Sequence, residues 1–278
     1  AFLCILCGLG CEKDPPAPQP FFFMQLSDPQ FGFYTGNKDF VKETVNFEKA
    51  IVAANRLRPA FVIVTGDLVN EAGNAAQLAE YKRIISLLDT NIAIYHVAGN
   101  HDLTNMPDST DIIAFRKQFG PDYYSFKYQN LQGIVLNSLY FKSPGTVQKQ
   151  ADEQDKWLRE ELKLANSNAM APLMVFQHYS WFLTDTAESS GYFNININTR
   201  KKYLDLFAAH QVSHIFAGHY HRNAFGKFGE LEMVTTGPVG RPLGNDPSGL
   251  RIIIVRGQQV SHQYYALDSI PQQINLNP

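Results

Sequence analysis

Five times along this chain, a short run of apolar residues ends at a cluster of carboxylate, amide or imidazole side chains. The clusters occupy residues 28–30, 66–67, 99–102, 177–178 and 218–221. Continuous apolar runs of this length are typical of strands that are buried on both faces of a sheet. Side chains at the ends of parallel strands collect at one edge of the sheet, where α/β domains bind their ligands. The pattern therefore predicts a sheet-based domain with one polar site built from distant segments.

The first half of the chain alternates between predicted strands and helices. The runs 21–26, 61–65 and 92–99 have the character of strands, and the stretches near 40–57 and 74–88 that of helices. Hydrophobic residues make up 45% and charged residues 18% of the 278 residues, a globular composition that allows one large domain or two small ones. The strand–turn–helix alternation predicts an α/β fold.

The second half of the chain contains more predicted strands and fewer predicted helices. Apolar runs at 133–138, 173–178 and 213–219 predict further strands. Residues 149–166 predict a helix, with an apolar face formed by Trp157, Leu158, Leu162 and Leu164. The last four runs, at 223–228, 231–236, 251–255 and 260–267, predict a meander with glycine turns.

The first 20 residues predict processing and anchoring. Residues 1–10 are uncharged and mostly apolar, which suits the apolar region of a signal peptide and is too short for a membrane span. Cys11 follows Gly10, and this arrangement resembles the lipobox of bacterial lipoproteins, in which the cysteine is acylated. Secretion without a lipid is the alternative. Four prolines within 12–20 predict an extended tether.

The predicted organisation has four parts: residues 1–11 as the signal-peptide end with its lipobox-like cysteine, 12–20 as the tether, 21–268 as the folded domain and 269–278 as a frayed tail. The chain would be an extracytoplasmic, membrane-anchored bacterial lipoprotein in the periplasm or at the cell surface. It would meet the membrane only through an acylated Cys11. A net charge of -2 without a cluster of Lys and Arg argues against nucleic-acid binding.

The five clusters together supply carboxylate oxygen, amide oxygen and imidazole nitrogen. This donor set suits divalent ions such as Mn, Fe or Zn. A hydroxide that bridges two such ions is a nucleophile at neutral pH, and a pair of ions can clamp a phosphoryl group during hydrolysis. A single Asp or Asn after a strand is usually a turn or a helix cap, so the prediction of a metal site depends on the whole set.

The order and spacing of the clusters resemble those of the calcineurin-like metallophosphoesterases. The steps are 39 residues from Asp28 to Asp67, 33 to Asn100, 78 to His178 and 41 to His219. Segments such as DPQFG (28–32) and GHYHRNA (218–224) resemble a protein serine/threonine phosphatase branch of that family. The resemblance covers about residues 21–268. It implies an α/β fold of the metallophosphoesterase type, a four-layer α/β/β/α sandwich of two mixed sheets.

The resemblance also implies a dinuclear metal centre. Asp28 and His221 would bind the first ion, and Asp67 would bridge both ions. Asn100, His178 and His219 would bind the second ion. Gln30 stands where most members of the family have a histidine, and its neutral amide oxygen is a harder and weaker ligand. The implied cofactors are two divalent ions among Mn, Fe, Mg and Zn, with Mn or Mg favoured on the Gln30 side.

Roles in catalysis and substrate binding follow from the same resemblance. His101 would protonate the leaving oxygen or stabilise the transition state, which is worth about 10²–10⁴ in rate. The serine/threonine phosphatases orient this histidine with an Asp that is Asn70 here, and Asp102 is the candidate to replace it. Arg222 and Asn100 would contact the substrate phosphate, although a surface ion pair would equally explain Arg222.

Aromatic residues flank the motifs and either line a cleft or pack as ordinary core, which is the better interpretation. They are Phe31, Phe33, Tyr34, Tyr179, Trp181 and Tyr192. Four histidines match no motif and are expected to be structural or exposed: His96, His210, His214 and His262.

Three functions remain open. The leading one is a metal-dependent phosphomonoesterase similar to the protein serine/threonine phosphatases, acting on phosphopeptides or small phosphoesters. The second is a phosphodiesterase on cyclic nucleotides or glycerophosphodiesters, because the same metals serve both reactions. The third is an anchored binding or scaffold protein with a weakened metal site, which the residues Gln30 and Asn70 suggest.

Overall fold

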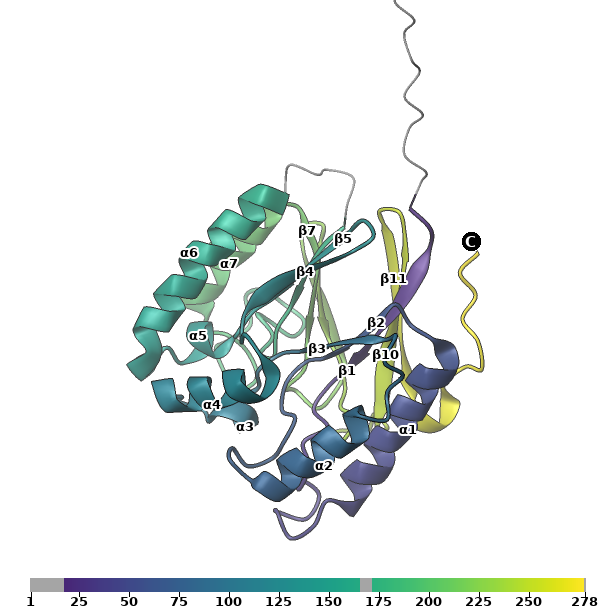
Figure 1. Cartoon of the computed structure of the whole chain (residues 1–278). Helices are drawn as coiled ribbons and strands as arrows, with labels where there is room; N and C mark the ends of the chain where they lie inside the picture. Colours follow the sequence, from purple (N-terminus) through teal and green to yellow (C-terminus); the bar gives the residue numbers. More distant parts are fainter. Residues whose placement is uncertain (1–17, 166–171, 278) are drawn as a thin grey trace, which may run out of the picture.

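The computed structural model describes residues 18–165 and 172–277, which form two mixed β-sheets packed face to face with helices outside them (Figure 1). This arrangement confirms the predicted α/β sandwich of two mixed sheets. The predicted signal-peptide segment 1–11 and most of the tether 12–20 lie outside the described residues. Within the described part of the chain, no helix combines the length and the apolar character that crossing a membrane would need.

The first sheet has the strand order β11–β10–β1–β2–β3. Its strands are β1 (Phe21–Leu26), β2 (Phe61–Val64), β3 (Ala93–His96), β10 (Gly249–Arg256) and β11 (Gln259–Ala266). Strands β1, β2 and β3 run parallel, whereas β10 pairs antiparallel with β1, and β11 with β10. The three parallel strands therefore end at the same edge of the sheet.

The second sheet has the strand order β4–β5–β6–β7–β9–β8. Its strands are β4 (Tyr124–Tyr128), β5 (Leu131–Val135), β6 (Leu173–Phe176), β7 (Val212–Ala217), β8 (Ala224–Phe228) and β9 (Leu231–Thr235). The four central strands run parallel, and β4 and β8 close the two sides as antiparallel partners. Strands β6 and β7 carry the predicted donors of this sheet at their C-terminal ends.

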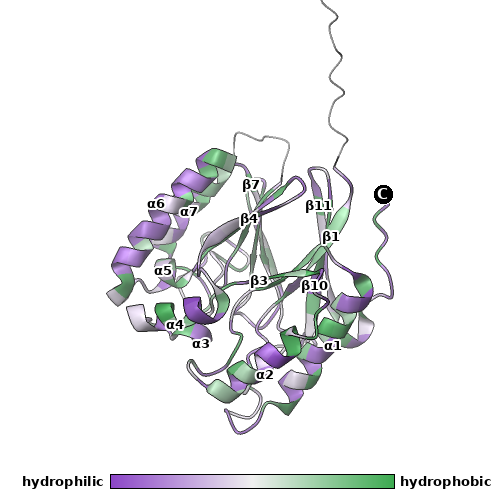
Figure 2. Ribbon diagram, in the orientation of Figure 1, coloured by the Kyte–Doolittle hydropathy of each residue, from purple (hydrophilic) through white to green (hydrophobic). Residues whose placement is uncertain are grey.

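Helices cover the outer faces of both sheets. Helices α1 (Val41–Leu57) and α2 (Ala75–Ile85) lie beside the first sheet, while α6 (Gln148–Ala165) and α7 (Ile197–Ala209) lie beside the second (Figure 1). The remaining helices are α3 (Asn100–Leu103), α4 (Ser109–Phe119), α5 (Leu139–Lys142) and the 3-10 turns Gly145–Val147 and Leu267–Ser269. Figure 2 shows hydrophilic and hydrophobic bands along α1, α2 and α6, as expected for helices with one face on a core.

An aromatic layer joins the two sheets. Phe23 of β1 stacks on Phe61 of β2 with ring centroids 4.5 Å apart. Phe23 also meets Phe176 of β6 and Phe216 of β7 edge-on, at 5.8 and 6.1 Å. Aromatic pairs of this kind contribute about 0.5–1.5 kcal/mol each beyond their burial. Because these contacts cross from one sheet to the other, they hold the strand ends of both sheets at a common edge.

The predicted meander at the end of the chain is wrong. Its four strands form two hairpins in different sheets, β8–β9 in the second sheet and β10–β11 in the first. The chain crosses between the sheets through residues 236–248. On the way, the backbone N–H groups of Val239 and Gly240 donate to the carbonyl oxygens of Ser27 and Asp28. Local alternation predicts strands, but the sheet that a hairpin joins depends on such long-range pairing.

The sequence patterns also miss some elements and misjudge the tail. Helices α4 and α7 and strand β4 are not predicted. Ile270, Ile274 and Leu276 pack against the core, and Arg256 donates hydrogen bonds to the backbone carbonyls of 275–277. The prediction of a frayed tail is therefore wrong for the described residues 269–277, because their spaced apolar side chains are partly buried against the core.

Candidate metal centre

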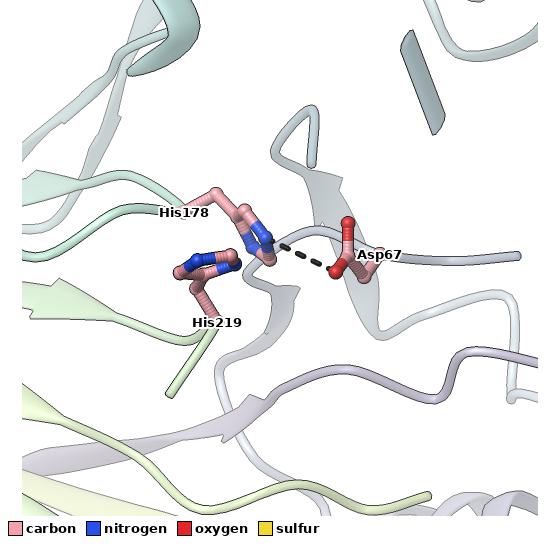
Figure 3. Close-up of side chains that lie close together, drawn as sticks. All are labelled: Asp67, His178 and His219. Atoms are coloured by element: carbon pink, nitrogen blue, oxygen red, sulfur yellow. Dashed lines mark ion pairs between the residues drawn. The ribbon is translucent and has the colours of Figure 1, made fainter. Parts of the chain in front are cut away.

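The ends of five strands meet at one edge of the sandwich and bring the predicted donors together. Asp28, Asp67 and Asn100 follow β1, β2 and β3, while His178 follows β6, and His219 and His221 follow β7. Donor atoms of Asp67, His178 and His219 lie within 4.8 Å of one another. Figure 3 shows these three side chains close together. Donor atoms of Asp28, Asp67 and His221 also lie within 4.8 Å of one another. All five residues are buried, and Asp67 belongs to both groups, which is the geometry that a bridging carboxylate needs.

Two glycines of the motifs are required by the close approach of backbone segments. A Cβ on Gly99 would lie 2.1 Å from the backbone nitrogen of Asp67. A Cβ on Gly218 would lie 2.0 Å from Ser27 Oγ and 2.6 Å from Asp28 Oδ2. A side chain at either position would therefore displace one of the buried carboxylates.

Backbone strain gathers at the same edge. Ten non-glycine residues among the described ones have a positive φ, and five of them belong to the predicted site. These five are Asp28, Gln30, Asp67, His219 and His221, with φ between 42° and 67°. Such conformations cost about 1–3 kcal/mol each and persist where the surrounding structure imposes them, often at functional sites.

Each of the three histidines in these two groups is held at one ring nitrogen by a backbone carbonyl. The contacts are His178 Nδ1 to Thr65 O at 2.8 Å, His219 Nε2 to Tyr192 O at 3.2 Å and His221 Nδ1 to Arg241 O at 2.6 Å. A carbonyl oxygen only accepts hydrogen bonds, so the nitrogen in contact carries a proton. In the neutral ring the other nitrogen keeps its lone pair, which is how metal-binding histidines are usually fixed.

The other ring nitrogens of His178 and His221 face the carboxylates. His178 Nε2 lies 3.2 Å from Asp67 Oδ2, and His221 Nε2 lies 3.4 Å from Asp28 Oδ1. His178 Nε2 also lies 3.0 Å from Asn100 Oδ1. The nitrogen and oxygen donors therefore converge, as a divalent cation would require.

Two amide side chains turn their oxygen toward the site. Asn100 donates from Nδ2 to Asn105 Oδ1 at 3.0 Å, which leaves its Oδ1 facing His178. Gln30 donates from Nε2 to Asn70 Oδ1 at 3.1 Å, and its Oε1 is buried with no hydrogen-bond partner among the described residues. An unsatisfied buried acceptor costs about 1–3 kcal/mol. A bound cation would satisfy the Gln30 oxygen, so the residues present fit a metal centre.

The electrostatic balance of the metal-free site also favours a cation. Burial would raise the pKa of Asp67, but the neighbouring His178 and His101 outweigh it and hold the pKa far below its usual value. Burial would lower the pKa of His178, but the Asp67 carboxylate raises it to about 9. His178 is therefore protonated at neutral pH in the absence of metal, and this positive charge stands where a metal ion would bind.

The structure gives His101 and Asp102 separate surroundings, which corrects the prediction that Asp102 orients His101. His101 Nδ1 contacts the backbone carbonyl of Asn70 at 2.7 Å. The Asp102 carboxylate accepts backbone hydrogen bonds from Leu68 and Gly99, both at 2.8 Å, and a longer one from Val69. Asp102 therefore ties the loop after β2 to the loop after β3, because its oxygens are used by amide donors.

Arg222 also has intramolecular partners. Its guanidinium donates twice to the carbonyl of Leu243, at 3.1 and 2.8 Å, and once to the Tyr220 hydroxyl at 3.2 Å. These bonds hold the loop after Gly240 against the motif. The structure thus gives Arg222 a structural role, and the phosphate contact stays a prediction.

The aromatic residues near the motifs divide into core and rim. Phe31 and Trp181 are fully buried, as ordinary packing predicts, and Tyr179 is almost so. Tyr192 is 52% exposed and its ring lies 4.8 Å from that of His219. Phe33 is half-buried, 5.1 Å from the ring of His221. Tyr34 is half-buried as well. Tyr192 and Phe33 therefore flank the two sides of the site.

A third group of possible donors lies between the sheets but is arranged differently. His214, Glu232 and His262 also place donor atoms within 4.8 Å of one another. His214 Nε2 lies 3.3 Å from Glu232 Oε2, so these two residues contact each other directly. Arg251 Nη1 lies 3.0 Å from His262 Nδ1, and a guanidinium only donates, so the nitrogen facing Glu232 carries the proton. This cluster is a polar contact between the sheets, which fits the expectation for histidines outside the motifs.

Comparisons with known proteins agree with this geometry. The chain is 34% identical to Serine/threonine-protein phosphatase CPPED1 of Bos taurus over 280 residues, which is 95% of this chain and 90% of that protein. The same protein of Homo sapiens is 34% identical over 283 residues, 96% of this chain and 90% of that one.

Solved structures with the same fold include other phosphatases. Purple acid phosphatase PPD1 from yellow lupin matches 90% of this chain and 52% of its own, with a TM-score of 0.67 and 13% identity. A dimetal phosphatase from Danio rerio matches 90% of this chain and 100% of its own, with a TM-score of 0.61 and 14% identity.

The family comparison covers the whole candidate site. Residues 23–223 match the calcineurin-like phosphoesterase family. This range contains both donor groups that share Asp67, together with Gln30 and Asn100. With its two-sheet sandwich and the position of these donors at the strand ends, the chain belongs to the calcineurin-like phosphoesterase family.

Proposed function

We propose that this phosphoric ester hydrolase is a metal-dependent phosphomonoesterase that removes phosphate from phosphoserine and phosphothreonine. The observation that carries the proposal is the pair of buried donor groups sharing Asp67. The histidines of these groups have one ring nitrogen fixed by a backbone carbonyl, an arrangement typical of metal ligands. Relatives named serine/threonine phosphatases, at 34% identity over nearly the full length, support the substrate class.

The donors divide into two sets in this proposal. Asp28, Gln30, Asp67 and His221 hold one divalent ion, and Asp67, Asn100, His178 and His219 hold the other. When bound, two such ions act as Lewis acids and lower the pKa of water for attack on phosphorus. We propose Mn or Mg at the Gln30 side, because a neutral amide oxygen suits a hard cation better than it suits Zn.

His101 is the proposed proton donor. Its ring is partly exposed, and Nδ1 donates to the Asn70 carbonyl when that nitrogen carries the proton. When the ring is doubly protonated, Nε2 is the nitrogen that can hand its proton to the leaving alkoxide of a serine or threonine, and the neutral ring with its proton on Nδ1 remains. Its backbone N–H donates to Asp67 Oδ1 at 2.8 Å, which places the proton donor beside the carboxylate that both sets share.

Hydrolysis rates on matched substrates test the reaction type. We expect faster Mn-dependent cleavage of p-nitrophenyl phosphate than of bis-p-nitrophenyl phosphate, and release of phosphate from phosphoserine peptides. Asp67→Asn should lower the rate by at least about 100-fold, since loss of an outer-shell partner alone costs 10–100-fold in metal affinity. Asp268→Asn, which alters an exposed carboxylate paired with Lys49, is the matched control.

Three results would contradict the proposal. Full activity of Asp67→Asn, or full activity in excess chelator, would remove the metal-dependent mechanism. A faster rate on the diester would replace the phosphomonoesterase with a phosphodiesterase that uses the same donors.

We also propose that the protein is a membrane-anchored lipoprotein outside the cytoplasm. The apolar run before Cys11 and the proline-rich segment 12–20 support this location. Expression in a host that processes lipoproteins should yield a membrane-bound form with an acylated Cys11, detected by mass spectrometry. Cys11→Ser should release the protein from the membrane fraction. An unmodified Cys11 in a secreted product would contradict the anchor.

A further inference from the structure

Four side-chain amides form a hydrogen-bonded chain that ends at the candidate metal centre. Gln77 of α2 is buried and donates from Nε2 to Asn37 Oδ1 at 2.8 Å. Asn70 donates from Nδ2 to the same oxygen at 2.6 Å and accepts from Gln30 Nε2 at 3.1 Å. Because an amide has one donor end and one acceptor end, each of these bonds fixes the direction of the next side chain.

The direction of the hydrogen bonds in this series of amides is set by Gln77, the amide farthest from the metal centre. Gln77 Oε1 accepts the backbone N–H groups of Asn70 and Glu71, both at 3.0 Å. Its Nε2 must therefore face Asn37. The Oδ1 of Asn37 also accepts a hydrogen bond from the Nδ2 of Asn70. The oxygen of Asn70 is then left for Gln30. Gln30 consequently turns its Oε1 away from the chain, where this oxygen is buried and unpartnered among the described residues.

We propose that Asn70 is a positioning residue that holds Gln30 with its oxygen presented to a divalent cation on the Asp28 and His221 side. This inference rests on the proposed function, because it assigns the amide to one of the two proposed ion sites. Without Asn70, the Gln30 amide could rotate and present its NH₂ group, which repels a cation. The chain of amides therefore prevents a flip that the Gln30 side chain alone would permit.

Asn70 serves the site in two separable ways. Its side chain holds Gln30, and its backbone carbonyl holds His101 Nδ1 at 2.7 Å. A substitution by alanine removes the first contact and keeps the second, since every residue has a carbonyl. Asn70→Ala should therefore weaken the binding of one ion, and it should do so only when Gln30 is present.

A double-mutant cycle on metal binding tests this dependence. Mn would be titrated calorimetrically into chelator-treated wild-type protein, Asn70→Ala, Gln30→Ala and the double variant. We expect two bound ions in the wild type and a weakening of one of them by about 10-fold or more in Asn70→Ala, the size expected for an outer-shell partner. Gln30→Ala should weaken the same ion at least as much, and the double variant should bind like Gln30→Ala.

Controls keep the result interpretable. Asn91→Ala removes an exposed amide that bonds to Asp89, and it should bind both ions like the wild type. If Asn70→Ala does not fold, Asn37→Ala takes its place, because it removes the acceptor that directs Asn70. It should weaken the same ion less strongly, and have no effect when Gln30 is already alanine.

Additive losses in the double variant, or wild-type affinity in Asn70→Ala, would overturn the positioning role. Binding of no second ion by the wild type would overturn it as well. A protein that shows the expected coupling but hydrolyses no phosphoester would keep the positioning role and remove the proposed function.

Discussion

His178 Nε2 lies 3.2 Å from Asp67 Oδ2, and both side chains are fully buried at the point where the two sheets meet. The residues are 111 positions apart in the sequence and come from different sheets. In the metal-free protein they form an ion pair, because the carboxylate raises the pKa of the imidazole. The pair therefore links the loop after β2 to the loop after β6 across the two sheets.

The ion pair predicts a dependence of stability on pH. The pKa of His178 is about 9 in the fold and about 6.5 in an unfolded chain. The stabilisation from the protonated ring is complete below pH 6.5 and is lost as the pH rises toward 9. A metal ion requires the deprotonated ring, so the stabilisation by metal should grow over the same range.

Thermal unfolding tests whether the stabilisation by metal grows with pH. The difference in Tm between Mn-loaded and chelated protein should be larger at pH 8.5 than at pH 6.5. A difference that is constant or shrinks with pH would contradict the displacement of a proton by the ion.

The proposed role of His101 predicts that the loss of rate on its substitution depends on the leaving group of the substrate. An alkoxide leaving from phosphoserine needs a proton, whereas p-nitrophenolate leaves readily without one. His101→Ala should therefore lower kcat on a phosphoserine peptide by about 10²–10⁴ and affect p-nitrophenyl phosphate much less. Equal losses on both substrates, with metal content unchanged, would show that His101 does not act as the proton donor.

The hydrogen bonds of Asp102 predict that its substitution lowers the stability of the fold. Its carboxylate accepts three backbone hydrogen bonds that join two loops, and Asp102→Asn would leave at least one buried N–H facing an NH₂ group. We expect the free energy of unfolding to fall by about 1–3 kcal/mol, measured by urea denaturation. Asp205→Asn, in an exposed pair with Lys201, should change it by less than about 1 kcal/mol. Unchanged stability of Asp102→Asn would contradict the loop-joining role.

The close packing around Gly218 predicts that a larger residue at this position would clash with Ser27 and Asp28. A methyl group there would meet Ser27 Oγ and Asp28 Oδ2 within 2.6 Å, and overpacking of this kind costs about 1–3 kcal/mol or more. Gly218→Ala should lower both the Tm and the affinity for Mn. Gly191→Ala is the matched control, since a methyl group there would come no closer than 4.0 Å to another residue. Equal behaviour of the two variants would argue against close packing behind Asp28.

The sequence predicts that these side chains converge, because their position follows from strand polarity. Asp28 and Asp67 each follow an apolar run, and parallel strands must bring their C-terminal ends to one edge. His178 and His219 follow the same rule in the second sheet. The packing of that sheet on the first requires the long-range aromatic contacts of Phe23, which a single strand pattern does not reveal.

The supporting partners of the donors could not be predicted. The carbonyls of Thr65, Tyr192 and Arg241 fix the histidine rings, and every residue has a carbonyl, so none leaves a signal in the sequence. The Asn105 amide that orients Asn100 matches no motif either. The same limit explains the error on Asp102, because its choice of backbone donors depends on how two loops approach each other.

We expect two cations to share Asp67 at this edge of the sandwich. Anomalous diffraction from crystals soaked in Mn tests this arrangement. It should give two anomalous peaks, one beside Asp28 and His221 and one beside His178 and His219, with Asp67 contacting both. A single peak, or peaks confined to the cluster of His214, Glu232 and His262, would contradict it.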